Sequence, residues 1–438
     1  MAMPIVTMSL PVNVFMTALL AKAFVLPKTT IGLISALPFF GNFLQIFAAP
    51  FLARWRPPKI VMLGAAALHM VSWAALGALL PLIPRDNPEV AGQWLIAWFL
   101  TTSCFGAVAG VSWNAWIQEW VPYRIRGKYF GRRNATLQIS TLTFLLVAGW
   151  SLAHWSYAIP TFQILIAGAV AMRVFSLRWQ WISPAQPRKT SVTIALPFRT
   201  QLDVVLGSKS LLGFIAFGAV WSFAANCFGP FYHVFMFDQL GLTAFEVGVL
   251  AMLAQLSGAL SFPAWGRLLD RYGNKAVMTF SLILWQAQNF LWCILTPENS
   301  GLLYLMWVWG GATSAGFILG QFTLLLKLIP VEAKNLAIGV HLAVTSLVAA
   351  IAPITGGAVL TWALARWPDP MAVHHACFVV QPVVALLGCT LLLRVQEPRA
   401  SSLTMVFGAM RNIRTLSGVF GLSFLVNYVF YRAQKEDK

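Results

Sequence analysis

The sequence predicts an all-α polytopic membrane protein with 12 transmembrane helices in two parallel six-helix repeats. Three observations support this fold class: the composition, the distribution of basic residues and an internal repeat. Of the 438 residues, 59% are hydrophobic and only 10% are charged, and the mean hydropathy is +0.74. Soluble domains carry about 25% charged residues, so this chain is suited to a lipid bilayer and not to water.

Twelve apolar runs are long enough to cross a bilayer, because a transmembrane helix needs roughly 20 apolar residues. The first six predicted spans are 4–26, 30–53, 60–81, 93–118, 134–155 and 159–180. The second six are 210–237, 243–265, 276–296, 301–326, 335–364 and 371–394. The five cysteines lie singly in or beside these runs, without a CxxC pair or a His partner, so we expect no disulfide, metal or cofactor.

Basic residues give the spans a direction, because Lys and Arg accumulate on the cytoplasmic side. With a cytoplasmic N-terminus, 26 of the 30 Lys and Arg fall on cytoplasmic loops, helix ends and tails, and Lys22, Lys28, Arg85 and Arg366 fall outside. Lys22 is expected to snorkel to the outer surface. We therefore expect an integral protein of the cell (inner) membrane with both termini cytoplasmic. The net charge of +17 is spread over membrane-flanking segments, which argues against nucleic-acid binding.

Two segments of the first half recur in the second. Residues 50–62 align with 266–278 at a shift of 216, and residues 121–131 align with 329–339 at a shift of 208. Because six helices return the chain to its starting side, the repeats are parallel. The predicted division is a first half (1–180), a cytoplasmic linker (181–209), a second half (210–394) and a cytoplasmic tail (395–438). In the tail, 416–431 is predicted as an interfacial helix in preference to a thirteenth span or disorder.

The stretch GRLLDRYGNK (266–275) resembles the loop signature Gly-x-x-x-Asp-Arg-x-Gly-x-Lys of the major facilitator superfamily, a family of secondary transporters. The resemblance covers roughly residues 4–394 and implies the fold of that superfamily. It also implies that Gly266, Asp270, Arg271 and Lys275 belong to a loop that holds the cytoplasmic side closed in one of two states. The copy in the first half departs from the signature, with Pro50 and Arg54 in place of the Gly and the Asp.

A second gating set is predicted in the basic stretch between the fourth and fifth spans. Arg126, Arg132 and Arg133 could pair with Asp270, Glu119 or Glu332 when the cytoplasmic side is closed. Snorkelling cations that only mark the cytoplasmic side remain the alternative.

The resemblance implies that helices 1, 4, 7 and 10 line a central cavity. On helix 7, Ser222, Asn226 and His233 share one face beside Trp221, and Gly229-Pro230 predicts a break in that helix. The other candidate substrate-binding residues carry mainly amide, hydroxyl or indole groups; they are Asn13, Thr17, Asn42, Asn114, Gln138, Gln255, Trp307, Ser314, Gln321 and Thr345.

This lining suits a neutral polar solute, such as a sugar, a glycoside or a nucleoside, and no Lys or Arg is identified at mid-depth for an anion. Acidic residues map to loops, tails and helix ends, so His233 is the candidate proton site. No GxSxG, HExxH or P-loop motif indicates an enzyme. The predicted function is secondary transport, with a drug or metabolite efflux transporter as the alternative and a non-transporting receptor or lipid flippase as further alternatives. The expected partners of a monomer are the lipid bilayer and a small-molecule substrate, with protons as a candidate coupling ion.

Overall fold

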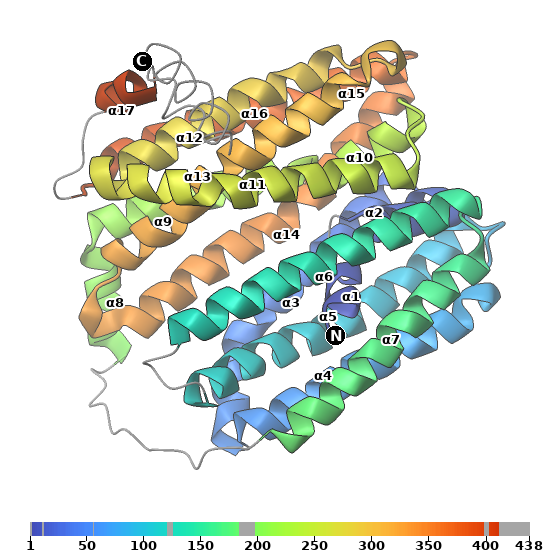
Figure 1. The fold of residues 1–438 in the computed structure, drawn as a ribbon, viewed down its shortest axis with the longest axis horizontal. Coiled ribbons are helices and arrows are strands. Elements are labelled where there is room, and N and C mark those ends of the chain that lie inside the picture. The colour runs from blue at the N-terminus through green and yellow to red at the C-terminus, as the bar shows by residue number, and fades with distance from the viewer. Residues whose placement is uncertain are drawn as a thin grey trace, which may run out of the picture. The chain divides into compact units, whose positions relative to one another are not determined.

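The computed structural model describes residues 2–10, 13–55, 57–120, 126–183, 198–397 and 403–410. Within these ranges the chain is helical, with turns and short connections but no strand (Figure 1). The all-α prediction is therefore confirmed for the described part of the chain.

Nine helices in the described ranges are long and apolar enough to cross a membrane, and they coincide with nine predicted spans. They are Pro58–Leu82, Pro88–Trp113, Ile159–Ile182, Lys209–Asp238, Ala244–Tyr272, Asn274–Ile294, Leu302–Leu328, Leu336–Arg366 and Pro370–Arg394. Two shorter apolar helices, Val14–Ala23 and Ile139–His154, fall in the predicted spans 4–26 and 134–155. The predicted span 30–53 lies within helix α3 (Lys28–Trp55).

Contacts between residues divide the chain into two compact units. The first contains Met1–Ala195, Asn226–Gly248 and Leu342–Pro370, and the second contains Leu196–Ala225, Val249–His341 and Met371–Lys438. The first unit therefore includes two segments from the predicted second half.

In the first unit, proline and asparagine fix several helix starts. α4 (Pro58–Leu79) begins with a proline, whose missing N–H would have no partner in the first turn in any case. α5 (Pro88–Trp120) begins in the same way, and the Asn87 side chain accepts a hydrogen bond from Val90 N at 3.2 Å. α7 (Ile159–Ile182) packs against α4, and α5 packs against both α3 and α4.

The first predicted span is a broken helix and not one continuous segment. α1 (Met3–Met8) ends at Ser9, and α2 (Val14–Thr17) continues into the π-helix η1 (Ala18–Ala23). Pro11 lies between α1 and α2 in the sequence and cannot donate a helical hydrogen bond. Asn13 restarts the helix, because its side chain accepts a bond from Met16 N at 2.8 Å.

The fifth helix begins earlier than predicted. α6 (Arg126–His154) includes Arg126, Arg132 and Arg133 in its opening turns, whereas the sequence analysis assigned them to a loop. Hydropathy reports where a helix enters hydrocarbon but not where it begins, and Arg and Lys are good helix formers.

In the second half of the sequence, the predicted span 210–237 (helix 7) consists of α9 (Lys209–Cys227) followed by α10 (Gly229–Asp238). The break at Phe228 confirms the interruption predicted at Gly229-Pro230. α11 (Ala244–Tyr272), α12 (Asn274–Asn289, extended by η4, Phe290–Ile294), α13 (Leu302–Leu328), α14 (Lys334–Arg366), α15 (Pro370–Phe378), α16 (Val380–Gly388) and η7 (Cys389–Arg394) complete the predicted spans.

The linker and the tail also contain helices. α8 (Phe198–Gly207) lies in the predicted linker and contacts η6 (Val331–Ala333) in the second unit. α17 (Leu403–Met410) lies in the tail and packs against α12, and its Val406 is fully buried in a cluster with Trp265, Leu268 and Phe280. The interfacial helix predicted at 416–431 lies outside the described residues.

Candidate functional site

The predicted helix 7 face is divided between two helical segments. Ser222 lies in α9 within the second unit, whereas Asn226 and His233 belong to the first unit, His233 within α10. His233 is buried, with 7% of its surface exposed, and Ser222 and Asn226 are half-buried. The helix break at Phe228 separates Asn226 from His233.

An aromatic cluster in the second unit surrounds the predicted Trp221. Its ring centroid lies 5.2 Å from that of Trp285 on α12 and 4.6 Å from that of Phe317 on α13. Trp285 and Phe317 are 6.0 Å apart, so the three rings form one group, the aromatic cluster. Trp221 and Trp285 are half-buried and Phe317 is buried. Sequence reasoning missed Trp285, because helix 9 is not among the helices that the resemblance places at the cavity.

Polar groups adjoin the aromatic cluster. A Cβ added at Gly310 on α13 would lie 2.8 Å from Gln288 Oε1 and 3.6 Å from Trp285 Nε1, so these side chains cover the glycine. The cluster therefore combines flat apolar faces with the amide group of Gln288.

The predicted substrate residues on α13, α11 and α14 have mixed environments. Ser314 donates to the carbonyl of Gly311 in its own helix at 3.1 Å, and Thr345 donates to Leu342 O at 3.4 Å. Trp307 and Gln321 are half-buried, and Gln255 is exposed within the second unit.

In the first unit, Asn13 uses its side chain for local structure. Besides capping α2, its amide donates to Leu10 O at 2.8 Å. Thr17 is buried and Asn42 is exposed. The side chains of Asn114 and Gln138 lie outside the described residues. Asn13 therefore has most of its hydrogen-bonding capacity filled by the backbone in this conformation.

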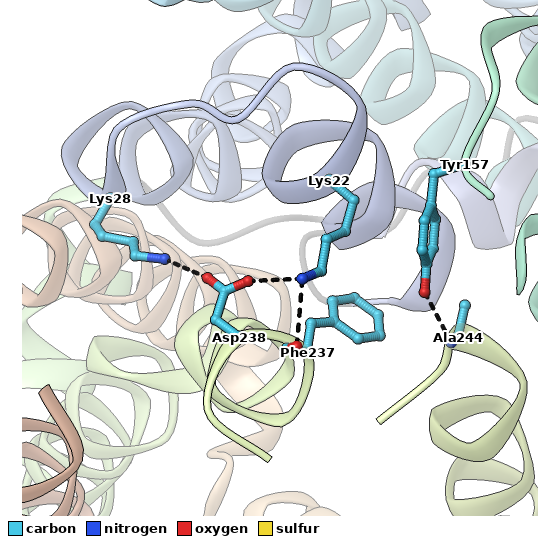
Figure 2. A network of polar contacts seen from close by, with 6 residues as sticks. All are labelled: Lys22, Lys28, Tyr157, Phe237, Asp238 and Ala244. Carbon is cyan, nitrogen blue, oxygen red and sulfur yellow. Dashed lines mark hydrogen bonds and ion pairs between the residues drawn. The ribbon is translucent and has the colours of Figure 1, made fainter. Parts of the chain in front are cut away.

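Three charged side chains form an ion-pair cluster at the predicted outer end of the first unit (Figure 2). Asp238, the last residue of α10, accepts from Lys22 Nζ and from Lys28 Nζ, each at 2.9 Å. Lys22 also donates to Phe237 O at 3.3 Å, and its ammonium lies 5.9 Å from the Phe237 ring centroid. Lys22 is thus held by α10, where the sequence analysis expected only snorkelling.

A further contact lies beside this ion-pair cluster. The Ala244 N–H, at the start of α11, donates to Tyr157 Oη at 3.2 Å (Figure 2). Tyr157 has a φ of 57°, in the left-handed region, and lies between α6 and α7. Elements from both halves of the sequence thus meet at this end of the first unit.

The signature loop in the second unit has a different bonding pattern from the one expected. Gly273 has a φ of 88°, in the left-handed region that favours glycine at the turn before α12. A Cβ at Gly266 would meet only Leu319 at 4.0 Å, so close packing does not require glycine there. Asp270 and Arg271 are exposed, and Asp270 has no ion pair among the described residues.

The carboxylate that organises this loop is Glu397, which sequence reasoning missed. Its oxygens accept from Asn274 N at 3.1 Å, from Lys275 N at 2.7 Å and from Lys327 Nζ at 3.0 Å. Lys275 Nζ in turn donates to Val395 O at 2.9 Å. The Glu397 side chain is 2% exposed, so a buried carboxylate caps the N-terminus of α12.

The remaining predicted gating residues are not brought together within the described part of the chain. Glu332 is exposed in η6. The side chains of Glu119, Arg126, Arg132 and Arg133 lie outside the described residues, so their pairing remains a prediction.

The helices define a polytopic helical membrane protein. The chain belongs to the Major Facilitator Superfamily, whose family model matches residues 3–225 and again residues 212–432. The two matches begin at positions separated by nearly the same shift as the sequence repeats. This agreement confirms the family that the signature loop indicates.

Two fungal proteins are similar over part of the chain. The chain is 24% identical over 153 residues to the MFS-type transporter calB of Penicillium decumbens and 29% identical over 150 residues to the MFS-type transporter opaD of Aspergillus ustus. These matches cover 35% and 34% of this chain and only 25% and 23% of the relatives' length.

Solved structures share the fold over most of the chain. The xylose transporter XylE from E. coli, in an inward-open conformation, has a TM-score of 0.66 at 13% identity, with 93% of this chain and 98% of that chain covered. The nucleoside transporter NupG has a TM-score of 0.63 at 15% identity, covering 90% and 97%. A bacterial homologue of the human lysosomal transporter Spinster has a TM-score of 0.64 at 13% identity, covering 90% and 94%. At these identities the likeness shows the fold alone.

Proposed function

We propose that this membrane transporter moves a neutral polar solute, such as a sugar, a glycoside or a nucleoside, by alternating access, and that it has no catalytic activity. The observation that carries the proposal is the aromatic cluster of Trp221, Trp285 and Phe317 with its adjoining polar groups. Aromatic faces stack on the apolar faces of sugar and nucleoside rings, while amide and hydroxyl groups bond their hydroxyls. A xylose transporter and a nucleoside transporter have the same fold, which is consistent with this class of solute.

Charge adds support for a neutral solute at this cluster. The amide of Gln288, which lies beside Trp285 at Gly310, carries no charge. A charged substrate would require an oppositely charged partner to offset the loss of its hydration. We infer that either no ion is coupled to transport or a proton is carried by His233, the imidazole of α10.

The experiment is an uptake assay in proteoliposomes with a panel of a pentose, a hexose, an aryl glycoside and a nucleoside, each with and without a pH gradient. Trp221→Ala should lower the apparent affinity for the transported solute by roughly 10-fold or more, and Trp221→Phe should retain most of it. Trp179→Ala is the matched control, because Trp179 is 63% exposed on α7.

The results distinguish the alternative functions. Saturable uptake of one panel member supports the proposal, and efflux of many unrelated apolar compounds would favour the exporter instead. Binding without flux would indicate a receptor. Equal transport by wild type and Trp221→Ala would remove the aromatic cluster from the substrate site.

A further inference from the structure

Arg173 is a buried cation inside a membrane-spanning helix. It lies in α7, about 14 Å from the last residue of that helix at 1.5 Å per residue, which is close to the middle of the hydrocarbon layer. Its side chain is buried, with 8% of the residue exposed, and its Nε has no hydrogen-bond partner. Among the described residues, no ion pair of Arg173 is found. From the sequence, Arg173 is counted among the basic residues of cytoplasmic loops, helix ends and tails; in the structure it lies within α7, nine residues before the last residue of that helix.

The neighbours of Arg173 follow from the packing of α7 on α4, which lie side by side (Figure 1). At one end of the contact, Gln163 Nε2 donates to Gly77 O at 2.7 Å, and a Cβ added at Gly77 would lie 2.9 Å from Ile166. At the other end, Leu177 packs on a cluster that includes Ala66. The two helices are therefore antiparallel, with a fixed register between these two contacts.

This register places Arg173 level with His69 on α4. His69 Nε2 lies 3.2 Å from Ser9 Oγ. Ser9 donates its own proton to Ile5 O at 2.7 Å and accepts from Trp73 Nε1 at 3.1 Å. Because the Ser9 proton is already donated, we assign His69 Nε2 as the donor and Ser9 Oγ as the acceptor. The imidazole is therefore held by a polar network between α1 and α4.

Among the described side chains before position 200, no carboxylate forms an ion pair with Arg173. The acidic residues before position 200 are Asp86, Glu89 and Glu119. Asp86 and Glu89 flank the start of α5, and Glu119 is next to its last residue, so all three map to helix ends. A charged group within the membrane is costly unless it is paired, and such groups commonly mark sites of function.

We propose that Arg173 forms a binding site for a small monovalent anion, a carboxylate or a halide, where α4 and α7 pack in the first unit. The guanidinium supplies the charge and a fork of donors that fits a carboxylate, and the surrounding apolar helices strengthen the attraction. His69 borders the site and is positioned by Ser9. The anion is a second ligand, separate from the neutral solute, and this site does not depend on the proposed function of the aromatic cluster.

The test is thermal unfolding of the purified full-length chain in nanodiscs, titrated with sodium acetate or sodium chloride against sodium sulfate of equal ionic strength. Wild type should show a saturable rise in Tm, because a ligand that binds the folded state stabilises it. Arg173→Met should lose the saturable rise and should be at least as stable as wild type in sulfate, since an unpaired charge has been removed. Arg173→Lys should weaken the apparent affinity by roughly 10-fold or more, because the forked donor is lost.

Arg178→Gln is the matched control, because Arg178 is an exposed cation on the same helix, and it should respond as wild type does. A rise with acetate but not with chloride would assign the ligand as a carboxylate, and a rise with both would assign a general monovalent anion. No saturable rise in wild type, or the same rise in Arg173→Met, would overturn the site. If Arg173→Met does not fold, the wild-type titration and Arg173→Lys still decide the question.

Discussion

At the scale of single residues, His233 and Asp238 of α10 have different environments. Asp238 is committed to Lys22 and Lys28, whereas His233 is a buried imidazole five residues earlier. A proton carrier must gain and lose charge during the cycle, and a carboxylate held by two ammonium groups is poorly suited to protonation. His233 is therefore the better candidate.

If His233 couples a proton to transport, His233→Gln should abolish the response of uptake to a pH gradient while facilitated exchange of solute continues. Glutamine keeps a polar side chain of similar size but does not titrate. The measurement is uptake into proteoliposomes with and without an imposed gradient, with His154→Gln at an exposed position as the control. A full response in His233→Gln would show that this histidine is not the carrier.

A substitution at Asn226 tests whether the polar face of helix 7 contacts the solute, and it does not depend on whether transport is coupled to a proton. Asn226→Ala should reduce transport of the solute by roughly 10-fold or more if its amide bonds the solute, because the solute hydroxyl would lose a partner. The reduced transport supports a contact between Asn226 and the solute only if the variant inserts normally into the membrane and keeps the wild-type Tm. Unchanged uptake would remove Asn226 from the site.

At the scale of elements, α10 is joined to the first unit through charged side chains and close packing. It contacts α2 and α3, and the ion-pair cluster lies at its last residue. The exposed fractions of Lys22, Lys28 and Asp238 side chains are 28%, 22% and 31%, so water partly screens the pairs. The cluster is thus a moderate and not a dominant stabilising contact.

Asp238→Asn should lower the stability of the protein by about 1 kcal/mol, since it removes the charge that both lysines share. The check is a double-mutant cycle of Asp238→Asn with Lys28→Gln in thermal unfolding, with Asp86→Asn at an exposed position as the control. Strict additivity of the two substitutions would mean that the pair contributes no coupling.

The N-terminus of α12 depends on Glu397. Glu397→Ala should destabilise the protein by about 2 kcal/mol, because it removes a cap and leaves a buried helix end without a charge-assisted partner. Glu397→Gln should cost less, since its amide oxygen can still accept one of the two backbone bonds. Glu298→Ala, an exposed acidic residue in η5 (Pro297–Asn299), is the control for thermal unfolding.

The sequence could predict the elements better than their partners. Gly229-Pro230 predicted the break in helix 7, because proline and glycine act on their own backbone. The partner of Lys22 could not be predicted, because Asp238 is 216 positions away and only tertiary packing brings them together. The start of α6 was predicted too late, since hydropathy does not register a helix that extends beyond the membrane.

At the scale of the whole molecule, the direction of the chain across the membrane follows from its basic residues and remains a prediction. With cytoplasmic termini, the exposed loop at Arg85 faces outward and the signature loop at Arg271 faces the cytoplasm. In intact cells, Arg85→Cys should therefore react with a membrane-impermeant maleimide, whereas Arg271→Cys should react only after permeabilisation. The wild type gives the background from the five native cysteines, two of which, Cys227 and Cys377, are buried. If instead Arg271→Cys reacts in intact cells and Arg85→Cys reacts only after permeabilisation, the chain has the opposite orientation in the membrane.

The docking of the tail has a consequence for biosynthesis. Glu397 and α17 contribute to the second unit, yet they follow all of its other elements in the sequence. Until they are synthesised, the first N–H groups of α12 have no carboxylate partner and the cluster around Trp265 lacks Val406. This unit is therefore completed only after its last predicted span has been made, and a stop codon shortly before position 397 should yield a chain that inserts fully but is degraded faster than the chain that includes these residues.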